Sequence, residues 1–258
     1  MRLFLPVMFA LLLFSGADAE DRELARIFSG NGVEGTMAIV SLHSGKTFVH
    51  DESRARRRLP AASTFKILNT LIALEERAVE GKDEVIGWDG SMYDFPDWNR
   101  DQTLESAFRV SCVWCYQELA RRVGAGKYRE YVRRCSYGEL AEPFDGTRFW
   151  LDGSLRISAI EQVEFLRRVF CRELPFRQAS FDTLREIMVA GKTPAYTLRA
   201  KSGWAAASDP QIGWYVGYVE TADDVWFFAT NIDLHGPKEL PVRQALTLEA
   251  LRAKGIID

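Results

Sequence analysis

The sequence predicts an α+β fold, in which an antiparallel sheet is flanked by helices and a helical subdomain lies beside it. Three observations lead to this prediction: strand patterns near both ends of the chain, mostly helical periodicity in the middle, and one further helix after the last strands. Because a sheet built from both ends folds as one cooperative unit, we expect a single domain with a cleft beside its helical part. With 258 residues, 47% of them hydrophobic, the chain can bury a sizeable core.

The individual elements follow from periodicity and turn chemistry. Residues 36–41 and 46–50 flank a Ser-Gly turn and predict a β-hairpin. Residues 63–78 predict a helix that is buried on most sides, because its apolar face is broad. A capping box of Ser158 and Glu161 is expected to open one of the later helices. The remaining expected elements are helices at 103–122, 127–134, 158–171, 180–190 and 240–254, and strands at 197–202, 212–220 and 224–232.

The N-terminal segment has the pattern of a secretory signal peptide. Arg2 precedes an apolar run from Leu3 to Phe14, and residues 17–19 (ADA) fit an A-x-A cleavage site. The run is short for a bilayer span, which disfavours the alternative of an uncleaved membrane anchor. We therefore expect a signal peptide at 1–19, a folded domain at 20–258, a periplasmic location and no membrane attachment after cleavage.

The charge balance argues against nucleic acid as a partner, since the net charge is −3. A short basic run precedes the predicted helix at 63–78, and we interpret it as solvated surface. The run consists of Arg54, Arg56, Arg57 and Arg58.

The cysteines are expected to be buried free thiols, although export would permit disulfides. Cys112 and Cys115 have a C-x-x-C spacing, but they fall inside a helical pattern and not at a thioredoxin-like strand-to-helix turn. Cys135 and Cys171 complete the set. The histidines are scattered and share no ligand spacing with the cysteines, so no metal site is expected. The sequence leaves monomer and homodimer open.

The segment Ser63-Thr64-Phe65-Lys66 suggests nucleophilic catalysis. Ser63 lies where the predicted helix begins, so backbone N–H groups and the positive end of the helix dipole point toward it. Lys66 follows one turn later on the same face. A serine hydroxyl needs a neighbouring base, and a lysine serves as one only where burial lowers its pKa. S-x-x-K alone is equally compatible with a helix cap and a solvated lysine.

Two further motifs make the pattern specific. Residues 111–113 (SCV) lie in the helical middle, and residues 201–203 (KSG) lie on a predicted strand. S-x-x-K, a second serine-containing triplet and a K-T-G-like triplet, in this order, form the signature of penicillin-recognising enzymes. Placing the first two on helices and the third on a strand is what a cleft between two subdomains requires.

With these motifs in place, the chain resembles the class D, or oxacillinase-type, serine β-lactamases over nearly all of residues 20–258. Class D has S-x-V where class A has S-D-N, and the class A motif E-x-x-L-N is absent here. Residues 149–162, 213–218 and 240–243 are similar to the family segments F-W-L…L-x-I-S-A…Q, W-W-V-G-W and L-P-x-R. The resemblance implies the fold shared by serine β-lactamases and penicillin-binding proteins.

The resemblance also implies an activity, the hydrolysis of penicillin-type β-lactams, which gives resistance. Ser63 would form the acyl-enzyme. In this family the motif lysine takes up CO2, so Lys66 is expected to be an N6-carboxylated general base, with no cofactor besides CO2 or bicarbonate. Carboxylation requires a neutral amine and hence an apolar pocket, which Phe65, Val113 and Leu151 would supply.

Further roles are carried over from the family motifs. The Trp150 indole N–H would hold the lysine carboxylate, and Ser111 would relay a proton to the lactam nitrogen. Lys201 would supply positive charge beside that relay. The backbone N–H groups of Ser63 and Trp204 would form the oxyanion hole. The substrate-binding set comprises Lys201, Ser202, Gly203, Trp204 and Arg243, with Ser202 and Arg243 binding the substrate carboxylate.

Two positions depart from the family pattern, and several retain a structural alternative. Glu139 follows Tyr-Gly where the family usually has Asn, and it is expected to add negative charge near the cleft rim. Ser202 replaces the commoner Thr and retains the hydroxyl. Trp150 and Trp214 also fit a role as core aromatics, and Arg243 also fits a surface ion pair.

Two other functions remain open at the level of sequence. One is a penicillin-sensor domain that is acylated without turnover, and the other is a peptidoglycan D,D-peptidase. The chain shows only a leader where such proteins usually carry membrane anchors. The substrate spectrum depends on the loops at 88–100 and 204–211, whose shapes the sequence does not determine.

Overall fold

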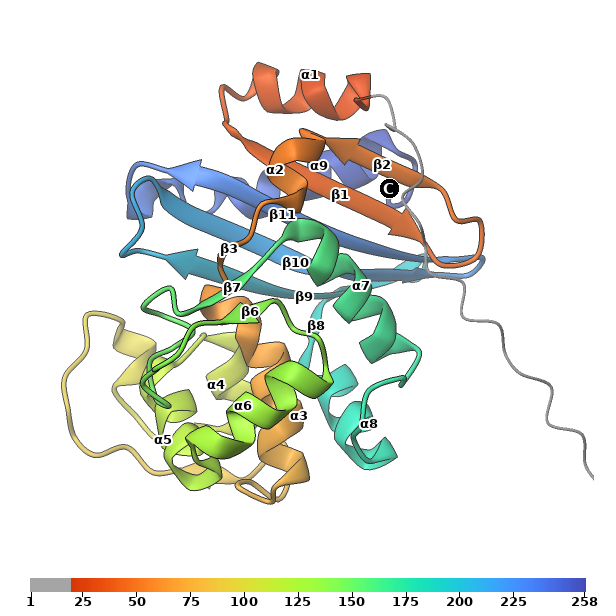
Figure 1. Ribbon diagram of the computed structural model, residues 1–258. Coiled ribbons are helices and arrows are strands. Elements are labelled where there is room, and N and C mark those ends of the chain that lie inside the picture. The colour runs from red at the N-terminus through yellow and green to blue at the C-terminus, as the bar shows by residue number, and fades with distance from the viewer. Residues whose placement is uncertain (1–19) are drawn as a thin grey trace, which may run out of the picture.

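A computed structural model describes residues 20–258, so the predicted signal peptide lies outside the described residues. Its centre is a six-stranded antiparallel sheet with the strand order β2-β1-β11-β10-β9-β8 (Figure 1). Both ends of the chain contribute strands, as predicted. The strands are β1 (Gly35–Ser41), β2 (Thr47–His50), β8 (Val189–Lys192), β9 (Tyr196–Ala205), β10 (Gln211–Thr221) and β11 (Val225–Leu234).

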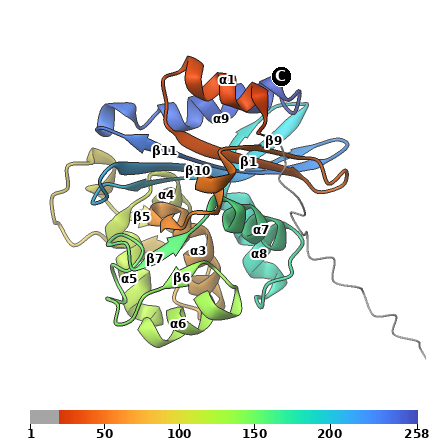
Figure 2. The same cartoon turned by 45° about the horizontal axis from the view of Figure 1, so that its top comes forward.

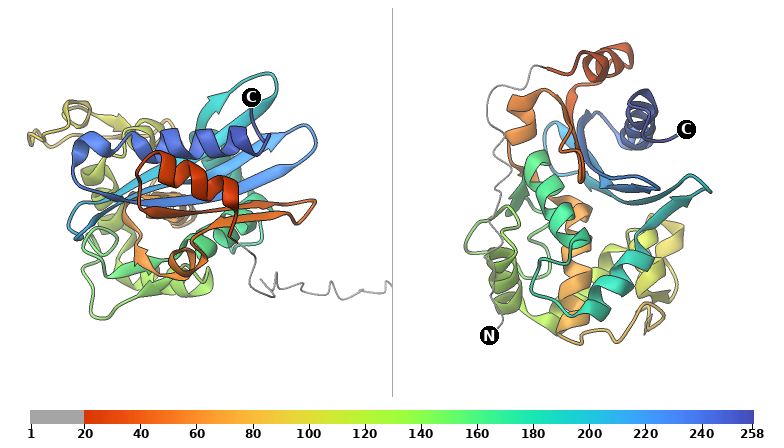
Figure 3. Two further views of the ribbon diagram at one scale, coloured as in Figure 1. Left: turned by 90° about the horizontal axis from the view of Figure 1, so that it is seen from above. Right: turned by 90° about the vertical axis from the view of Figure 1, so that its right-hand side faces the viewer.

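One face of this sheet is covered by the first and last helices, α1 (Arg22–Gly30) and α9 (Val242–Ala253), which lie side by side (Figures 2 and 3). Helix α1 was not predicted. Its start is capped by Asp21, whose side chain accepts hydrogen bonds from the Glu23 and Leu24 amides at 3.1 and 3.0 Å. An acidic cap before an amphipathic turn was a usable signal in the sequence.

The opposite face packs against α7 (Ala159–Phe170) and the helical subdomain (Figure 1). The predicted capping box is present, with Ser158 N donating to Glu161 Oε2 at 2.9 Å and Glu161 N donating to Ser158 Oγ at 3.2 Å. The other helices of this side are α3 (Lys66–Glu75), α4 (Leu104–Arg109), α5 (Val113–Val123), α6 (Ala125–Arg134) and α8 (Gln178–Ile187). The α+β prediction is confirmed.

Three predicted helices have different bounds in the structure. The helix at 63–78 begins with a 3₁₀ turn, η1 (Ala62–Phe65), before α3. The helix at 103–122 is broken into α4 and α5 at Ser111, which adopts φ 57°. The helix at 180–190 ends earlier, because residue 189 already pairs with β9 as the start of β8.

Short elements connect the two layers. The short elements are α2 (Glu52–Arg56), β3 (Leu59–Pro60), β4 (Val85–Ile86), β5 (Gln102–Thr103), β6 (Glu139–Leu140), β7 (Leu155–Ile157), η2 (Pro96–Trp98) and η3 (Pro237–Glu239).

None of the helices within residues 20–258 is long and apolar enough to cross a membrane.

The basic run is not uniformly solvated, and the prediction was wrong for Arg54. Its side chain is buried, Nε donates to Asn231 Oδ1 at 2.8 Å, and Nη1 donates to Asp233 Oδ2 at 3.0 Å. This pair joins α2 to β11. Removing either partner would leave a buried charge without compensation, a change that typically costs about 3–5 kcal/mol.

The cysteine prediction was half wrong, because Cys112 and Cys115 form a disulfide with a Cα–Cα distance of 5.6 Å. Cys112 is the N-cap of α5 and does not lie inside a helix. A cap side chain reaches toward the third residue of its helix, which here is Cys115. Cys135 and Cys171 are free; Cys135 is buried as predicted, whereas Cys171 is half-buried.

Candidate active site

The predicted nucleophile and its lysine are adjacent at the start of α3. Lys66 Nζ donates a hydrogen bond to Ser63 Oγ at 2.9 Å. Lys66 is fully buried and Ser63 is 8% exposed. Ala62, immediately before the serine, adopts φ 48°, a conformation that non-glycine residues rarely hold away from functional sites.

The Lys66 amine lies in an aromatic environment. Its Nζ is 5.1 Å from the centre of the Tyr116 ring, and Tyr116 in turn hydrogen-bonds Thr70 at 2.7 Å. Burial lowers the pKa of Lys66 to about 7, so a large fraction of the amine is neutral near neutral pH. Tyr116 was missed in the sequence, although it follows Val113 by nearly one helical turn.

Trp150 lies in the same aromatic core as Phe65, the residue before Lys66. The ring is fully buried and stacks on Phe65 with centroids 5.8 Å apart. Its Nε1 is buried and makes no hydrogen bond within residues 20–258, a state that needs an explanation such as a ligand, a water or a modification. Leu151 is half-buried against the same core, and Val113 is half-buried at the first residue of α5.

A second serine–lysine pair comes from the other two motifs. Lys201, on β9, donates to Ser111 Oγ at 3.1 Å and to the Ser202 carbonyl oxygen at 2.9 Å. Its Nζ also lies 5.4 Å from the centre of the Phe108 ring, a contact that sequence reasoning missed. Ser111 was expected on a helix, but it occupies the left-handed break between α4 and α5.

Strand β9 reaches the nucleophile because Gly203 has no side chain. A Cβ there would lie 3.1 Å from Thr64 Cγ2 and 3.2 Å from Trp214 Cβ, so glycine allows the close approach of β9 to η1. Strand β8 pairs with residues 197–199 of β9, which leaves the outer edge of residues 201–205 beside η1. Trp204, on this edge, donates its Nε1–H to Gln211 Oε1 at 2.9 Å.

Arg243 approaches the same region from the first turn of α9. Its Nη1 is buried and has no hydrogen-bond partner in the described part of the chain, and burial lowers the pKa of its guanidinium to about 10. The stem passes Gly213, whose Cβ position lies 3.4 Å from Arg243 Cδ. Gly213 and Tyr215 share one face of β10, and Ser202 is the partner of Tyr215 in the register, so Ser202 shares the face that Arg243 reaches.

The site is strongly cationic. Lys66, Lys201 and Arg243 take part in none of the ion pairs formed within residues 20–258. Burial, then the charges of Lys66 and Arg243, hold the pKa of Lys201 well below its ordinary value. Such a cluster favours an anionic ligand. Within the described part of the chain, no three His, Cys, Asp or Glu side chains gather to hold a metal ion.

A buried hydrogen-bond network holds Thr64, the residue after the nucleophile. Gln162 Nε2 donates to Thr64 Oγ1 at 2.8 Å, and the Tyr137 hydroxyl lies 3.4 Å from both atoms. Sequence reasoning missed this network. Glu139, two residues after Tyr137, is exposed and pairs with Arg58 at 2.9 Å on the outer three-stranded sheet.

The structure also decides between the alternatives left open for Trp214 and Arg243. Trp214 is fully buried and donates its Nε1–H to the Pro60 carbonyl at 2.9 Å, which makes it a core aromatic. Arg243 forms no surface ion pair within residues 20–258, so that alternative was wrong.

Comparisons with known proteins agree with this geometry. The family described as the penicillin binding protein transpeptidase domain matches residues 34–252. Beta-lactamase OXA-48 of Klebsiella pneumoniae is 37% identical over 230 residues, which cover 89% of this chain and 87% of the relative. Beta-lactamase OXA-20 of Pseudomonas aeruginosa is 37% identical over 259 residues, or 97% and 96% of the two chains. The chain belongs to the class D β-lactamases.

Solved class D β-lactamases share the fold of the whole described domain. FUS-1 (OXA-85) of Fusobacterium nucleatum subsp. polymorphum superimposes with a TM-score of 0.90 at 34% identity, covering 93% of this chain and 100% of that one. The class D β-lactamase YbXI from Nostoc gives a TM-score of 0.88 at 40% identity, covering 90% and 98%. The predicted family and fold are therefore confirmed.

Proposed function

We propose that this class D β-lactamase hydrolyses the β-lactam ring of penicillin-type antibiotics through an acyl-enzyme on Ser63, and so gives resistance. The observation that carries the proposal is the 2.9 Å hydrogen bond from Lys66 Nζ to Ser63 Oγ inside a fully buried pocket. A lysine in this state has a pKa near 7 and is able to accept the serine proton.

In the acylation step, the bond from Ser63 Oγ to the lactam carbonyl carbon forms and the lactam C–N bond breaks. The serine proton passes to the Lys66 side chain; the Ser111 hydroxyl gives its proton to the departing nitrogen and receives this one in return, so Lys66 is neutral again and Ser111 is unchanged. Lys201, 3.1 Å from Ser111 Oγ, stabilises negative charge along that path. Water then attacks the ester with the same base, which releases Ser63.

The pocket also fits an N-carboxylated Lys66. Two features support it: an amine whose pKa is lowered to about 7, and the unpaired buried Nε1–H of Trp150. When bound, the carboxyl group would supply an anionic oxygen base at the end of the Lys66 side chain. Trp150 would then have an acceptor, which removes the cost of a buried donor without a partner.

The substrate carboxylate would be bound by Arg243 and Ser202. The unpaired buried Nη1 of Arg243 supports this assignment, since a guanidinium binds a carboxylate through two parallel hydrogen bonds. The N–H groups of Ser63 and Trp204 would receive the oxyanion, because Gly203 lets β9 approach η1.

The wider setting follows from the leader and the charge. Cleavage at residue 19 would release the enzyme into the periplasm, where it meets β-lactams and neither a membrane nor nucleic acid is part of its function. Monomer and homodimer both remain compatible with this proposal.

Steady-state turnover of a chromogenic cephalosporin by the purified protein tests the function. We expect many turnovers per active site, and none with Ser63→Ala. A burst of one product per enzyme without further turnover would support the sensor alternative and overturn the proposal. Indifference to added bicarbonate after removal of CO2 would overturn the carboxylated lysine while leaving the acyl-enzyme in place.

A further inference from the structure

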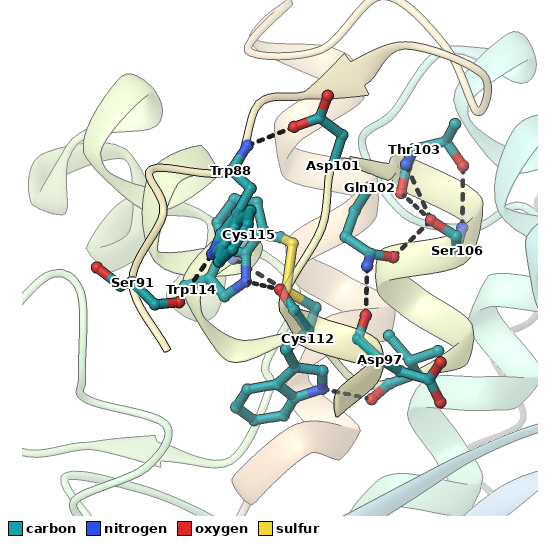
Figure 4. The surroundings of a disulfide bond; sticks show 12 residues. Trp88, Ser91, Asp97, Asp101, Gln102, Thr103, Ser106, Cys112, Trp114 and Cys115 are labelled. Atoms are coloured by element: carbon teal, nitrogen blue, oxygen red, sulfur yellow. Dashed lines mark hydrogen bonds between the residues drawn. A yellow bond between two sulfur atoms is a disulfide. The ribbon is translucent and has the colours of Figure 1, made fainter. Parts of the chain in front are cut away.

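A disulfide joins Cys112, the middle residue of the second motif, to Cys115, two residues beyond the motif (Figure 4). Both cysteines are fully buried. Cys112 separates Ser111 from Val113, the two residues that give the motif its S-x-V form. Cys115 precedes Tyr116, whose ring lies 5.1 Å from Lys66 Nζ. The disulfide therefore connects backbone that carries Ser111 to backbone that carries a wall of the Lys66 pocket.

The backbone at Ser111 requires such support. Its φ of 57° is a conformation that non-glycine residues avoid unless the surroundings determine it. The hydrogen bond from Lys201 Nζ to Ser111 Oγ depends on that conformation, because it directs the side chain toward β9. Relaxation of Ser111 would turn Cys112 away from α5, and a bond to Cys115 in the first turn of α5 opposes this rotation.

The outer side of the same turn is held by two indoles. Trp98 Nε1 donates to the Val110 carbonyl at 3.0 Å, and Trp114 Nε1 donates to the Trp98 carbonyl at 2.9 Å. These bonds join the loop at 88–100 to Val110, just before Ser111, and to Trp114, between the two cysteines. Two indole hydrogen bonds and the disulfide therefore both restrain the turn at residues 110–115.

We propose that Cys112 and Cys115 are positioning residues whose disulfide holds Ser111 and Val113 in their catalytic arrangement. The inference rests on the proposed function, in which Ser111 relays a proton, and on the role that the family resemblance implies for Val113 as a wall of the Lys66 pocket. One crosslink then sets two properties of the reaction, the proton delivery at Ser111 and the affinity of the Lys66 pocket for CO2.

The test compares the native oxidised protein with the Cys112→Ser/Cys115→Ser double variant. Serine keeps a capping oxygen at the start of α5, so the variant removes the crosslink without removing the cap. We expect kcat to fall about ten- to a hundredfold with KM changed less than about threefold, because misplacement of a proton relay affects the chemical step. The bicarbonate concentration for half-maximal activity should also rise several-fold.

A matched control is Cys171→Ser, which removes a free thiol outside the motif. It should leave kcat, KM and the bicarbonate response unchanged. Thiol titration of the oxidised, denatured wild type should find the two free cysteines, Cys135 and Cys171, and all four only after reduction. Finding four reactive thiols before reduction would overturn the proposal.

Should the double variant fail to fold, the wild type refolded with dithiothreitol supplies the same comparison. There the dithiol is oxidised to its cyclic disulfide, and Cys112 and Cys115 each gain one electron and one proton. Activity lost on reduction should return on reoxidation.

The outcome separates this inference from the proposed function. Absence of turnover by the wild type would contradict the function, while the rate of acylation by a fluorescent penicillin would still report on the positioning of the motif. A variant with a lower melting temperature but wild-type kcat, KM, acylation rate and bicarbonate response would show a merely structural disulfide and overturn the inference.

Discussion

The site contains two serine–lysine pairs, and their surroundings differ. Within residues 20–258, Lys66 donates to Ser63 Oγ, and its Nζ lies 5.1 Å from the centre of the Tyr116 ring. Lys201 donates to Ser111 Oγ and also to a backbone carbonyl oxygen, that of Ser202. Burial lowers the pKa of both lysines, but the carbonyl is an acceptor that favours the charged form of Lys201.

The difference is consistent with the two tasks proposed for these lysines. Lys66 has few acceptors, which favours the neutral amine that a base requires, whereas the carbonyl acceptor at Ser202 opposes the lowering of the Lys201 pKa and favours the charged form that would stabilise anions. The two are coupled, since the charge of Lys66 contributes to the lowered pKa of Lys201. Any loss of positive charge at Lys66 therefore favours the positive charge of Lys201, so each lysine supports the task of the other.

The largest expected effect separates the two lysines. Lys66→Ala should lower kcat/KM at least about 10⁴-fold and abolish both acylation and deacylation, as loss of a base that acts with its nucleophile does. Lys201→Ala should lower it about 10²- to 10³-fold, the usual loss when one stabilising group is removed. Single-turnover acylation by a fluorescent penicillin and steady-state turnover measure both. Equal losses in the two variants would contradict the division of tasks.

The next largest effect is expected for the Trp150 indole N–H, the proposed donor to a carboxylated Lys66. Trp150→Phe removes the Nε1–H but keeps a ring against Phe65, and we expect kcat to fall about tenfold or more at low bicarbonate. High bicarbonate should restore part of the activity. Because this Nε1 has no partner within residues 20–258, loss of its N–H should not itself lower the free energy of unfolding, and the cost that remains is that of the smaller ring in a fully buried site.

Trp214→Phe is the matched control. It also removes an indole N–H from a fully buried tryptophan, but this one donates to the Pro60 carbonyl at 2.9 Å. It should lower the free energy of unfolding by about 1 kcal/mol more than Trp150→Phe, because both variants lose ring volume but only this one loses a hydrogen bond, and it should leave the bicarbonate response unchanged. A bicarbonate response that changes in Trp214→Phe and not in Trp150→Phe would contradict the proposed role of Trp150 as donor to the carboxylated lysine.

The acid–base behaviour of Lys66 gives the third prediction. With a pKa of about 7, the neutral amine falls to roughly a tenth at pH 6, so kcat/KM should drop about tenfold between pH 8 and pH 6 in CO2-free buffer. A pH-independent rate over this range would remove the amine as the base. The pH profile of kcat/KM for the wild type measures this.

The free energy of unfolding should also depend on pH through Lys66. The folded pKa of Lys66 lies below the ordinary 10.5, so the unfolded chain binds more protons between about pH 7 and pH 10.5, and stability due to Lys66 rises with pH there. The burial cost is full below pH 7. Lys66→Met should therefore stabilise the fold most below pH 7, by up to about 5 kcal/mol, in denaturant titrations at several pH values.

Much of this site was predictable because its motifs are local. Ser63 and Lys66 are one helical turn apart, and Ser111 and Lys201 are marked by short triplets in a fixed order. The rings under the two lysines were not predictable. Tyr116 and the Phe108 ring read as helix core, and nothing local shows that a lysine from elsewhere lies against them.

The fold shows the same limit. Strands and helices with clear periodicity were predicted close to their observed bounds, whereas the break at Ser111 has no glycine or proline to mark it. The buried pair of Arg54 with Asp233 joins residues 179 positions apart, which no local pattern reveals. The Cys112–Cys115 disulfide required knowing that Cys112 caps α5, a consequence of the unpredicted break.

The smallest expected effect tests whether the Lys201–Ser111 hydrogen bond depends on the backbone or on the side chain of residue 202. Ser202→Thr adds a methyl to a strand position and keeps the hydroxyl, and β-branched residues suit strands. Because Lys201 bonds the carbonyl oxygen of residue 202, its bond to Ser111 should persist. We expect kcat within about twofold and KM within about threefold of the wild type, whereas Ser202→Ala should raise KM about tenfold by removing a hydrogen bond to the substrate carboxylate. A Ser202→Thr variant whose kcat fell as far as that of Ser111→Ala would show that this side chain belongs to the relay.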